Sequence, residues 1–186
     1  SLTGSIPDLS GLNYLSRLYL YDNQLTGSIP DTIGQLPLLE NLRLENNQLT
    51  GSIPDLSGLT NLSWLYLNTN QLSGPIPDNI PSRAYLFNNE FTGQIPASLA
   101  SLTWATERPL TLSGNYLDLT NVDPAIQLKI NSGEIEAALQ WEKDKRPDAI
   151  SKVWSSNSYL ENPTSMVTYG NYLYIADLEK GTISKI

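Results

Sequence analysis

Leucine and other apolar residues recur at fixed positions through the first 117 residues of this 186-residue chain. The stretch LSRLYLYDNQLTGSIP (15–30) fits the pattern L-x-x-L-x-L-x-x-N-x-L-[TS]-G-x-I-P. Copies cover 39–54, 62–77 and, more loosely, 81–96, and a fifth copy at 107–117 lacks the G-x-I-P part. The asparagines of successive copies are 24, 23, 19 and 26 residues apart. This period predicts a solenoid in which each repeat is one coil stacked on its neighbours.

Two leucines precede each asparagine by five and three residues and predict one short strand per repeat, as with Leu18 and Leu20. Residues two apart in a strand share a face, so these leucines point into the coil and the residue between them points outward. An inward asparagine amide can donate to and accept from backbone groups that would otherwise be buried unpaired. We therefore interpret the asparagines as a structural ladder: Asn23, Asn47, Asn70, Asn89 and Asn115. The glycine and proline of the G-x-I-P part predict a bend where strand pairing ends.

These fixed positions resemble the leucine-rich repeat family, and the L-[TS]-G-x-I-P part is similar to its plant-specific subtype, which also occurs in some bacterial and algal proteins. The resemblance covers 1–117 and implies an α/β-type arc, residues 1–118, of mostly parallel strands joined by short helical or 3-10 turns. In that family the strands line the concave side and the fold implies binding rather than catalysis. SLTGSIP (1–7) is the trailing half of a repeat, so we expect the chain to belong to a longer protein.

The outward strand positions carry aromatic and arginine side chains. Neighbouring strands lie about 4.8 Å apart, so we expect Tyr19, Arg43, Tyr66 and Tyr85 to form one column. Tyr, Trp and Arg are typical of protein contact sites, although rings can also simply pack on one another across a sheet. Six aromatics and three of the four arginines of the array share this face. It is our predicted partner-binding site: Arg17, Tyr19, Tyr21, Arg43, Glu45, Trp64, Tyr66, Asn68, Arg83, Tyr85 and Phe87.

A second row of polar residues directly follows the I-P dipeptides: Asp8, Asp31, Asp55 and Asp78. Stacked carboxylates could hold a divalent cation, since such cations take several oxygen ligands. Each aspartate also precedes a short turn whose first backbone N–H groups its side chain can cap, and we favour this cap interpretation. We predict no metal site and no cofactor. Asn61-Leu62-Ser63 is a candidate N-glycosylation sequon, relevant only on a eukaryotic secretory route.

Composition excludes several classes of function. The net charge of −8 argues against nucleic acid and anionic membrane surfaces as partners. No apolar run approaches the roughly 18 residues of a membrane span. The chain contains no Cys and no His, which excludes disulfides, zinc fingers and Ser-His or Cys-His catalytic pairs. We therefore expect a non-enzymatic protein. Plant extracellular relatives usually carry cysteine pairs in their caps, so composition leaves the compartment open, and the resemblance implies an extracellular, cell-surface or other exported location.

Residues 119–150 predict a helical cap or linker after the array. Asp123-Pro124 fits the N-cap and first position of a short helix. A second, stronger helix is predicted to begin at Asn131, with Glu134 as its capping-box partner, and to end before Pro147.

Residues 151–186 predict a small antiparallel β segment. The run NPTSMVTYGNYLYIADLEKGTISKI resembles one blade of an NHL-type β-propeller, a fold that typically needs four to eight blades. The favoured function is a recognition or scaffolding module, which holds a protein or glycan partner on the concave face, as a subunit of a larger assembly. The alternative is the non-catalytic arm of a larger enzyme or sensor whose activity lies in a propeller beyond Ile186.

Overall fold

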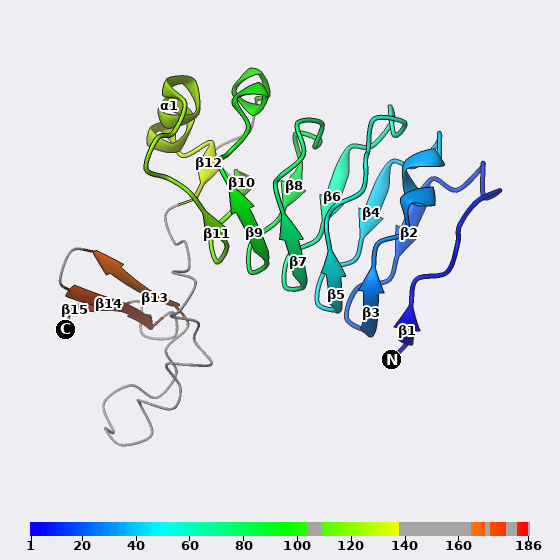
Figure 1. The fold of residues 1–186 in the computed structure, drawn as a ribbon, viewed down its shortest axis with the longest axis horizontal. Coiled ribbons are helices and arrows are strands. Elements are labelled where there is room, and N and C mark those ends of the chain that lie inside the picture. The colour runs from blue at the N-terminus through cyan, green and yellow to red at the C-terminus, as the bar shows by residue number, and fades with distance from the viewer. Residues whose placement is uncertain (104–108, 138–164, 170–171, 178–181, 186) are drawn as a thin grey trace. The chain divides into compact units, whose positions relative to one another are not determined.

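The computed structural model describes residues 1–103, 109–137, 165–169, 172–177 and 182–185. The chain divides into two compact units, Ser1–Ala138 and Leu139–Ile186. The first unit contains the repeat array, in which two parallel sheets run in chain order from coil to coil (Figure 1). The predicted solenoid of mostly parallel strands is thereby confirmed.

The predicted strands form the first sheet, in the order β2-β4-β6-β8-β10-β12. Its leucines align from coil to coil, since Leu18 pairs with Leu42 and Leu42 with Leu65. Leu42 and Leu65 are buried, whereas Leu18 is half-buried because β2 is the edge strand of this sheet. The strands are β2 (Arg17–Tyr19), β4 (Asn41–Arg43), β6 (Trp64–Tyr66), β8 (Ala84–Tyr85), β10 (Leu110–Thr111) and β12 (Ile135–Glu136).

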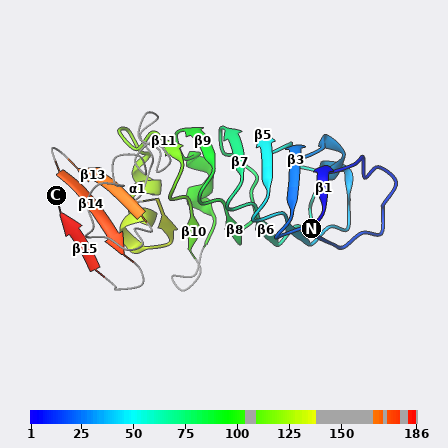
Figure 2. The same ribbon diagram turned by 90° about the horizontal axis from the view of Figure 1, so that it is seen from below.

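A second parallel sheet was not predicted, because we expected one strand and a bend in each repeat. The L-[TS]-G stretch of each coil instead pairs with the same stretch of the next, and these strands lie side by side in Figure 2. Gly27 and Gly51 have φ values of 76° and 77°, which glycine adopts without strain. The strands are β1 (Thr3–Ser5), β3 (Gln24–Ser28), β5 (Gln48–Gly51), β7 (Gln71–Gly74), β9 (Glu90–Gly93) and β11 (Tyr116–Leu117). Two 3-10 helices, η1 (Asp31–Gln35) and η2 (Ala97–Ser101), belong to the connecting segments.

Each ladder asparagine joins its own coil to the coil before it. Oδ1 of Asn47 accepts from the backbone N–H of Leu25 at 3.0 Å. Nδ2 of Asn47 donates to the carbonyls of Leu20 and Leu44, at 2.9 and 3.1 Å. The same kind of bond, from a backbone N–H of the preceding coil to Oδ1, occurs at all five positions: Asn23, Asn47, Asn70, Asn89 and Asn115. The contribution of these bonds to stability stays a prediction.

Helix α1 (Pro124–Ser132) follows the array and confirms the first predicted helix. Asp123 is its N-cap and accepts from the backbone N–H groups of Ala125 and Ile126, while Gly133 ends it in the left-handed conformation.

The predicted second helix is wrong over the residues that are described. Gly133 ends α1 two residues after the expected helix start at Asn131, and Ile135–Glu136 then forms β12, which pairs in parallel with β10. Ile135 is 1% exposed, so burial in the array outweighs the local helical pattern. The rest of that predicted helix lies outside the described residues.

The second unit contains a three-stranded antiparallel sheet in the order β13-β14-β15. Its strands are β13 (Ser165–Tyr169), β14 (Tyr172–Asp177) and β15 (Thr182–Lys185). The predicted antiparallel β segment is therefore present.

Candidate functional site

The outward side chains of the first sheet form a stack of rings and one guanidinium group, here called the aromatic face (Tyr19, Tyr21, Arg43, Trp64, Tyr66 and Tyr85). The rings of Tyr66 and Tyr85 are stacked, with centroids 4.6 Å apart and planes 10° apart. Trp64 and Tyr66 are nearly parallel at 6.0 Å. The centroid distance of 4.6 Å is close to the spacing of neighbouring strands, so the parallel sheet itself sets this stacking distance.

Arg43 lies between aromatic rings from the coils on either side. Its Cζ is 4.3 Å from the ring centroid of Tyr21 and 4.9 Å from that of Tyr66, both within cation–π range. Its Nε donates to Oε1 of Glu45 at 2.8 Å, and its Nη2 donates to the same oxygen. The hydrogen bond with Glu45 raises the pKa of Arg43 above its ordinary value, so the guanidinium stays charged.

Glu45 is a buried carboxylate at the base of the aromatic face. It is 5% exposed, and its Oε2 has no hydrogen-bond partner among the described residues. Removing one member of a buried ion pair leaves the other charge uncompensated. Replacing Arg43 would therefore leave the buried Glu45 carboxylate without its ion-pair partner.

The other predicted site residues lie around this pair. The Cζ of Arg83 lies 4.6 Å from the Trp64 ring. The predicted site residues differ in exposure: Arg17, Tyr19, Tyr21 and Arg83 are exposed, and Arg43, Trp64, Tyr66, Asn68, Tyr85 and Phe87 are half-buried. The rings do pack on one another, as the alternative interpretation expected, yet much of the set remains open to solvent.

The sequence pattern missed one polar residue of this sheet. Glu136 of β12 accepts from the hydroxyl of Ser113 at 2.6 Å. Because 131–146 was predicted to be helical, no signal placed Glu136 on a strand beside Thr111.

A second face, the hydroxyl face, lies on the second sheet. In β3, β5 and β7 the leucine is buried and the next residue points outward, as with Leu25 and Thr26, or Leu49 and Thr50. The outward positions from β1 to β7 carry no charge. The sequence signal of this face is a pair of hydroxyl residues two positions apart, as in the T-G-S triplets at 3–5, 26–28 and 50–52. The pair is recognised as one face only when the stretch is known to be a strand. The hydroxyl face consists of Thr3, Ser5, Thr26, Ser28, Thr50, Ser52, Ser73 and Thr92.

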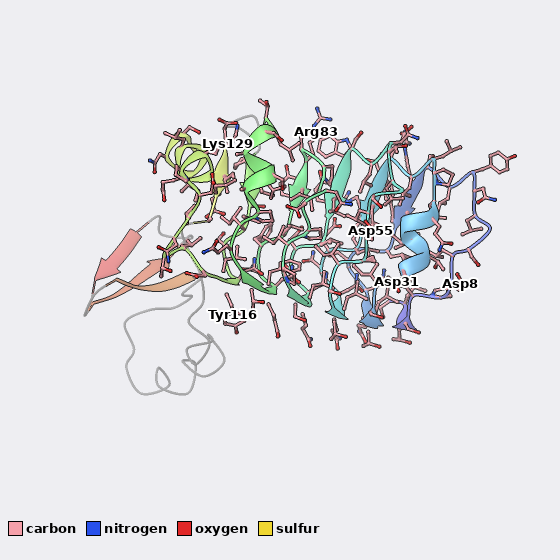
Figure 3. All side chains as sticks on the ribbon, turned by 45° about the horizontal axis from the view of Figure 1, so that its top comes forward. Asp8, Asp31, Asp55, Arg83, Tyr116 and Lys129 are labelled. Atoms are coloured by element: carbon pink, nitrogen blue, oxygen red, sulfur yellow. The ribbon has the colours of Figure 1, made fainter. Side chains whose placement is uncertain are left out.

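The aspartate row lies on connecting segments of successive coils, and Figure 3 shows Asp8, Asp31 and Asp55 on them. Asp55 accepts from the backbone N–H and the hydroxyl of Ser57, at 2.8 and 2.7 Å, and these bonds lower its pKa below the ordinary value. Asp8 makes the same pair of bonds with Ser10, so two of the four aspartates agree with the cap interpretation. Asp78 instead accepts from the hydroxyl of Ser98 in the next coil. Across the described residues, no group of three or more Asp, Glu, His or Cys could hold a metal ion.

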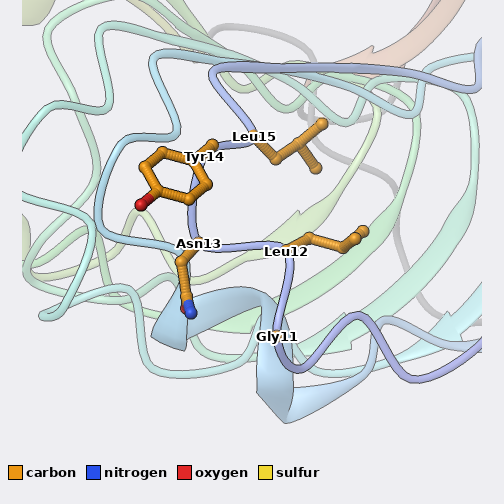
Figure 4. Close-up of a pocket in the computed structure, with 5 residues that line it drawn as sticks. All are labelled: Gly11, Leu12, Asn13, Tyr14 and Leu15. Carbon is orange, nitrogen blue, oxygen red and sulfur yellow. The ribbon is translucent and has the colours of Figure 1, made fainter.

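Two further surface features lie off the aromatic face. Asn61 of the sequon is exposed, and its Nδ2 donates to the carbonyl of Pro37 at 2.8 Å. A shallow, open hollow in the loop before β2 is lined by Gly11, Leu12, Asn13, Tyr14 and Leu15 (Figure 4). It contains none of the predicted site residues.

The leucine-rich repeat profile matches 14–36, 38–59 and 61–82. The crystal structure of the BIR2 ectodomain from Arabidopsis thaliana is 34% identical with a TM-score of 0.54, and the match covers 66% of this chain and 67% of that one. The chain belongs to the leucine-rich repeat family. No curated protein sequence matches it.

Two other crystal structures similar to this leucine-rich repeat chain differ in what they bind. The Arabidopsis receptor kinase HAESA, in complex with the peptide hormone IDA and the co-receptor SERK1, is 32% identical with a TM-score of 0.64, over 77% of this chain and 25% of that one. A plant ice-binding protein is 35% identical with a TM-score of 0.53, over 63% of this chain and 39% of that one. The chain thus spans well under half of each of these two proteins.

The comparisons give no support for the NHL-type blade expected near the C-terminus, and the sheet β13-β14-β15 stands as a small antiparallel sheet. Within the part of the chain that is described, no helix has the length and apolar character to cross a bilayer.

Proposed function

We propose that this leucine-rich repeat chain is a non-enzymatic recognition module that holds a protein or peptide partner on the aromatic face. The observation that supports it most is the stack that fixes Arg43 between Tyr21 and Tyr66. Rigid aromatic and guanidinium groups lose little rotamer freedom on binding and are frequent hot spots. HAESA, similar in fold, is bound to a peptide hormone and a co-receptor, and BIR3 is in complex with SERK2.

The proposal places the chain outside the cell or at its surface, within a larger assembly. BIR2 and HAESA are similar in fold, and the BIR2 structure is of an ectodomain. A glycan is the alternative occupant of the aromatic face, because aromatic side chains can also contact sugar rings.

Tyr66→Ala is expected to weaken partner binding about 30-fold, equivalent to about 2 kcal/mol, because Tyr66 contacts both Tyr85 and Arg43 at the centre of the stack. The partner is first captured by a photocrosslinking amino acid placed at Tyr19, which is 50% exposed. Its affinity for each purified variant is then measured by calorimetry.

Asp55→Ala is the matched control, because Asp55 lies on a connecting segment and caps a turn. It should change affinity less than about twofold, and Tyr66→Phe should keep most of the binding because the ring is retained. Intact affinity in Tyr66→Ala together with loss in Asp55→Ala would move the binding site to the aspartate row.

The hydroxyl face favours a second candidate function, binding to ice. Hydroxyl groups both donate and accept, and those on parallel strands repeat at about 4.8 Å, so a flat uncharged row of them can bond to many ordered water molecules at once. A plant ice-binding protein is among the similar structures, at 35% identity.

Under the second candidate, the purified chain slows ice recrystallisation and Thr50→Tyr abolishes the effect, because a bulky ring at the centre of the row prevents flat contact. Tyr66→Ala, on the other sheet, should leave the effect unchanged. If ice recrystallises as fast in the presence of the unaltered chain as in buffer alone, this candidate function is excluded.

A further inference from the structure

One edge of the Arg43 guanidinium remains unused among the described residues. An arginine has five N–H donors in a planar fork. Nε and Nη2 both donate to Oε1 of Glu45, which occupies the side edge. The end edge, formed by Nη1 and the second N–H of Nη2, has the geometry that matches a carboxylate with two parallel hydrogen bonds.

The position of this end edge is fixed before any partner arrives. The rings of Tyr21 and Tyr66, from the coils on either side, lie within cation–π range of the guanidinium, and Glu45 holds its side edge. The side chain of Arg43 nevertheless remains 35% exposed. Because the rotamer is already restricted, binding costs less conformational entropy than at a free surface arginine.

The predicted partner-binding residues are net positive, whereas the whole chain is negative. Among the predicted partner-binding residues, Arg17, Arg43 and Arg83 carry three positive charges and Glu45 carries one negative charge, which leaves +2, whereas the chain carries −8. Asp22 beside Tyr21 and Glu136 on β12 add two negative charges to the same sheet, so the positive charge is local to the three arginines, where it attracts an anionic group. Arg17 and Arg83 are both exposed and can add to this attraction.

We propose that the end edge of Arg43 binds a carboxylate of an acidic peptide segment, through Nη1 and Nη2 together. The inference rests on the proposed function, since it names the partner chemistry of the same face. Glu45 acts as a positioning residue: it holds the guanidinium and does not contact the partner. The carboxylate can come from an acidic side chain or from a chain end.

The test uses the full chain and three peptide probes at about 0.15 M salt, where screening removes weak long-range attraction. The probes are hexaglutamate with a blocked C-terminus, hexaglutamine with a blocked C-terminus and hexaglutamine with a free C-terminus. We expect hexaglutamate to bind at least about tenfold more tightly than blocked hexaglutamine, because only its side chains carry carboxylates. Tight binding of the free-ended hexaglutamine alone would assign the chain end as the source.

Arg43→Lys should weaken hexaglutamate binding at least about tenfold, because lysine keeps the charge and lacks the planar fork. Lys129→Arg is the charge-conserving control: it lies on α1, outside the aromatic face, and should change binding less than about twofold. The Nε–H resonance of Arg43, followed by NMR in the unaltered chain, should shift on titration. This measurement does not depend on how well a variant folds.

Unchanged hexaglutamate binding in Arg43→Lys would show that charge alone is sufficient, and an equal loss in Lys129→Arg would show that the loss is not specific to Arg43. Either result would overturn the inference. An unmoved Arg43 resonance, or equal binding of hexaglutamate and blocked hexaglutamine, would also overturn it. Each of these results would leave the Tyr66→Ala test of the proposed function standing, because that test uses the captured partner.

Discussion

Asn47→Ala is expected to lower the free energy of unfolding by about 3 kcal/mol, near the upper end of the cost of a buried unpaired group. The substitution removes the acceptor of the buried Leu25 N–H and the donor that reaches Leu20 and Leu44. The two carbonyls keep bonds from Asn23 and Asn70, so the unpaired N–H carries most of the loss.

Urea unfolding followed by circular dichroism measures this effect as a lower midpoint. Gln48→Ala is the control, because Gln48 follows Asn47 in sequence and is exposed on the second sheet. It should change stability by less than about 0.5 kcal/mol. An unchanged midpoint in Asn47→Ala would mean that the ladder does not stabilise the array.

Gly58→Ala is expected to destabilise the array by about 3 kcal/mol or more, because a Cβ at this position would lie 2.2 Å from the carbonyl oxygen of Gly34. The atoms that the added Cβ would meet belong to the Gly34 backbone, so no flexible side chain can move aside. Gly34→Ala should behave alike, since its Cβ would lie 2.3 Å from the carbonyl oxygen of Asp55. Both coils would have to separate to accept the methyl group.

Gly11→Ala separates this clash from the general cost of replacing a glycine. Its added Cβ would meet nothing within 4 Å, but its φ of 88° strains any L side chain, at a cost of about 1 kcal/mol. Thermal unfolding should therefore rank Gly58→Ala well below Gly11→Ala in stability. Equal midpoints for the two variants would show that the coils can move apart without penalty.

The leucine and asparagine positions could be predicted because each coil repeats the same inward contacts. Leu42, Leu44, Leu65 and Leu67 are all buried, as the alternation of the pattern requires. One copy of the pattern would be weak evidence for a coil, but five copies with the same residues at corresponding positions predict the coil reliably.

The second sheet and β12 could not be predicted because their strands depend on partners distant in sequence. The L-[TS]-G stretch is short and contains a glycine, so it reads as a bend until the same stretch of the next coil is placed beside it. Ile135–Glu136 likewise lies in a helical pattern, and its strand conformation comes from pairing with β10.

For the candidate site, the alignment of strand residues could be predicted from the register, whereas the contacts between their side chains could not. Strand register placed Tyr19, Arg43 and Tyr66 in one column, and the structure aligns their backbones in that way. The pattern gave no reason for Arg43 to approach Tyr21 more closely than Tyr19, at 4.3 against 5.9 Å, because that choice depends on its pairing with Glu45.

The step from Asn70 to Asn89 is only 19 residues, against 24 for the first step, yet Asn89 makes the ladder bonds of the longer coils. The missing residues come from the connecting segment after Pro77, so this part of a coil can shorten without disturbing either sheet. Evolution can therefore insert or delete residues there while the stacked coils keep their contacts. For protein engineering, the same segment is the natural place to insert an epitope or a second binding loop.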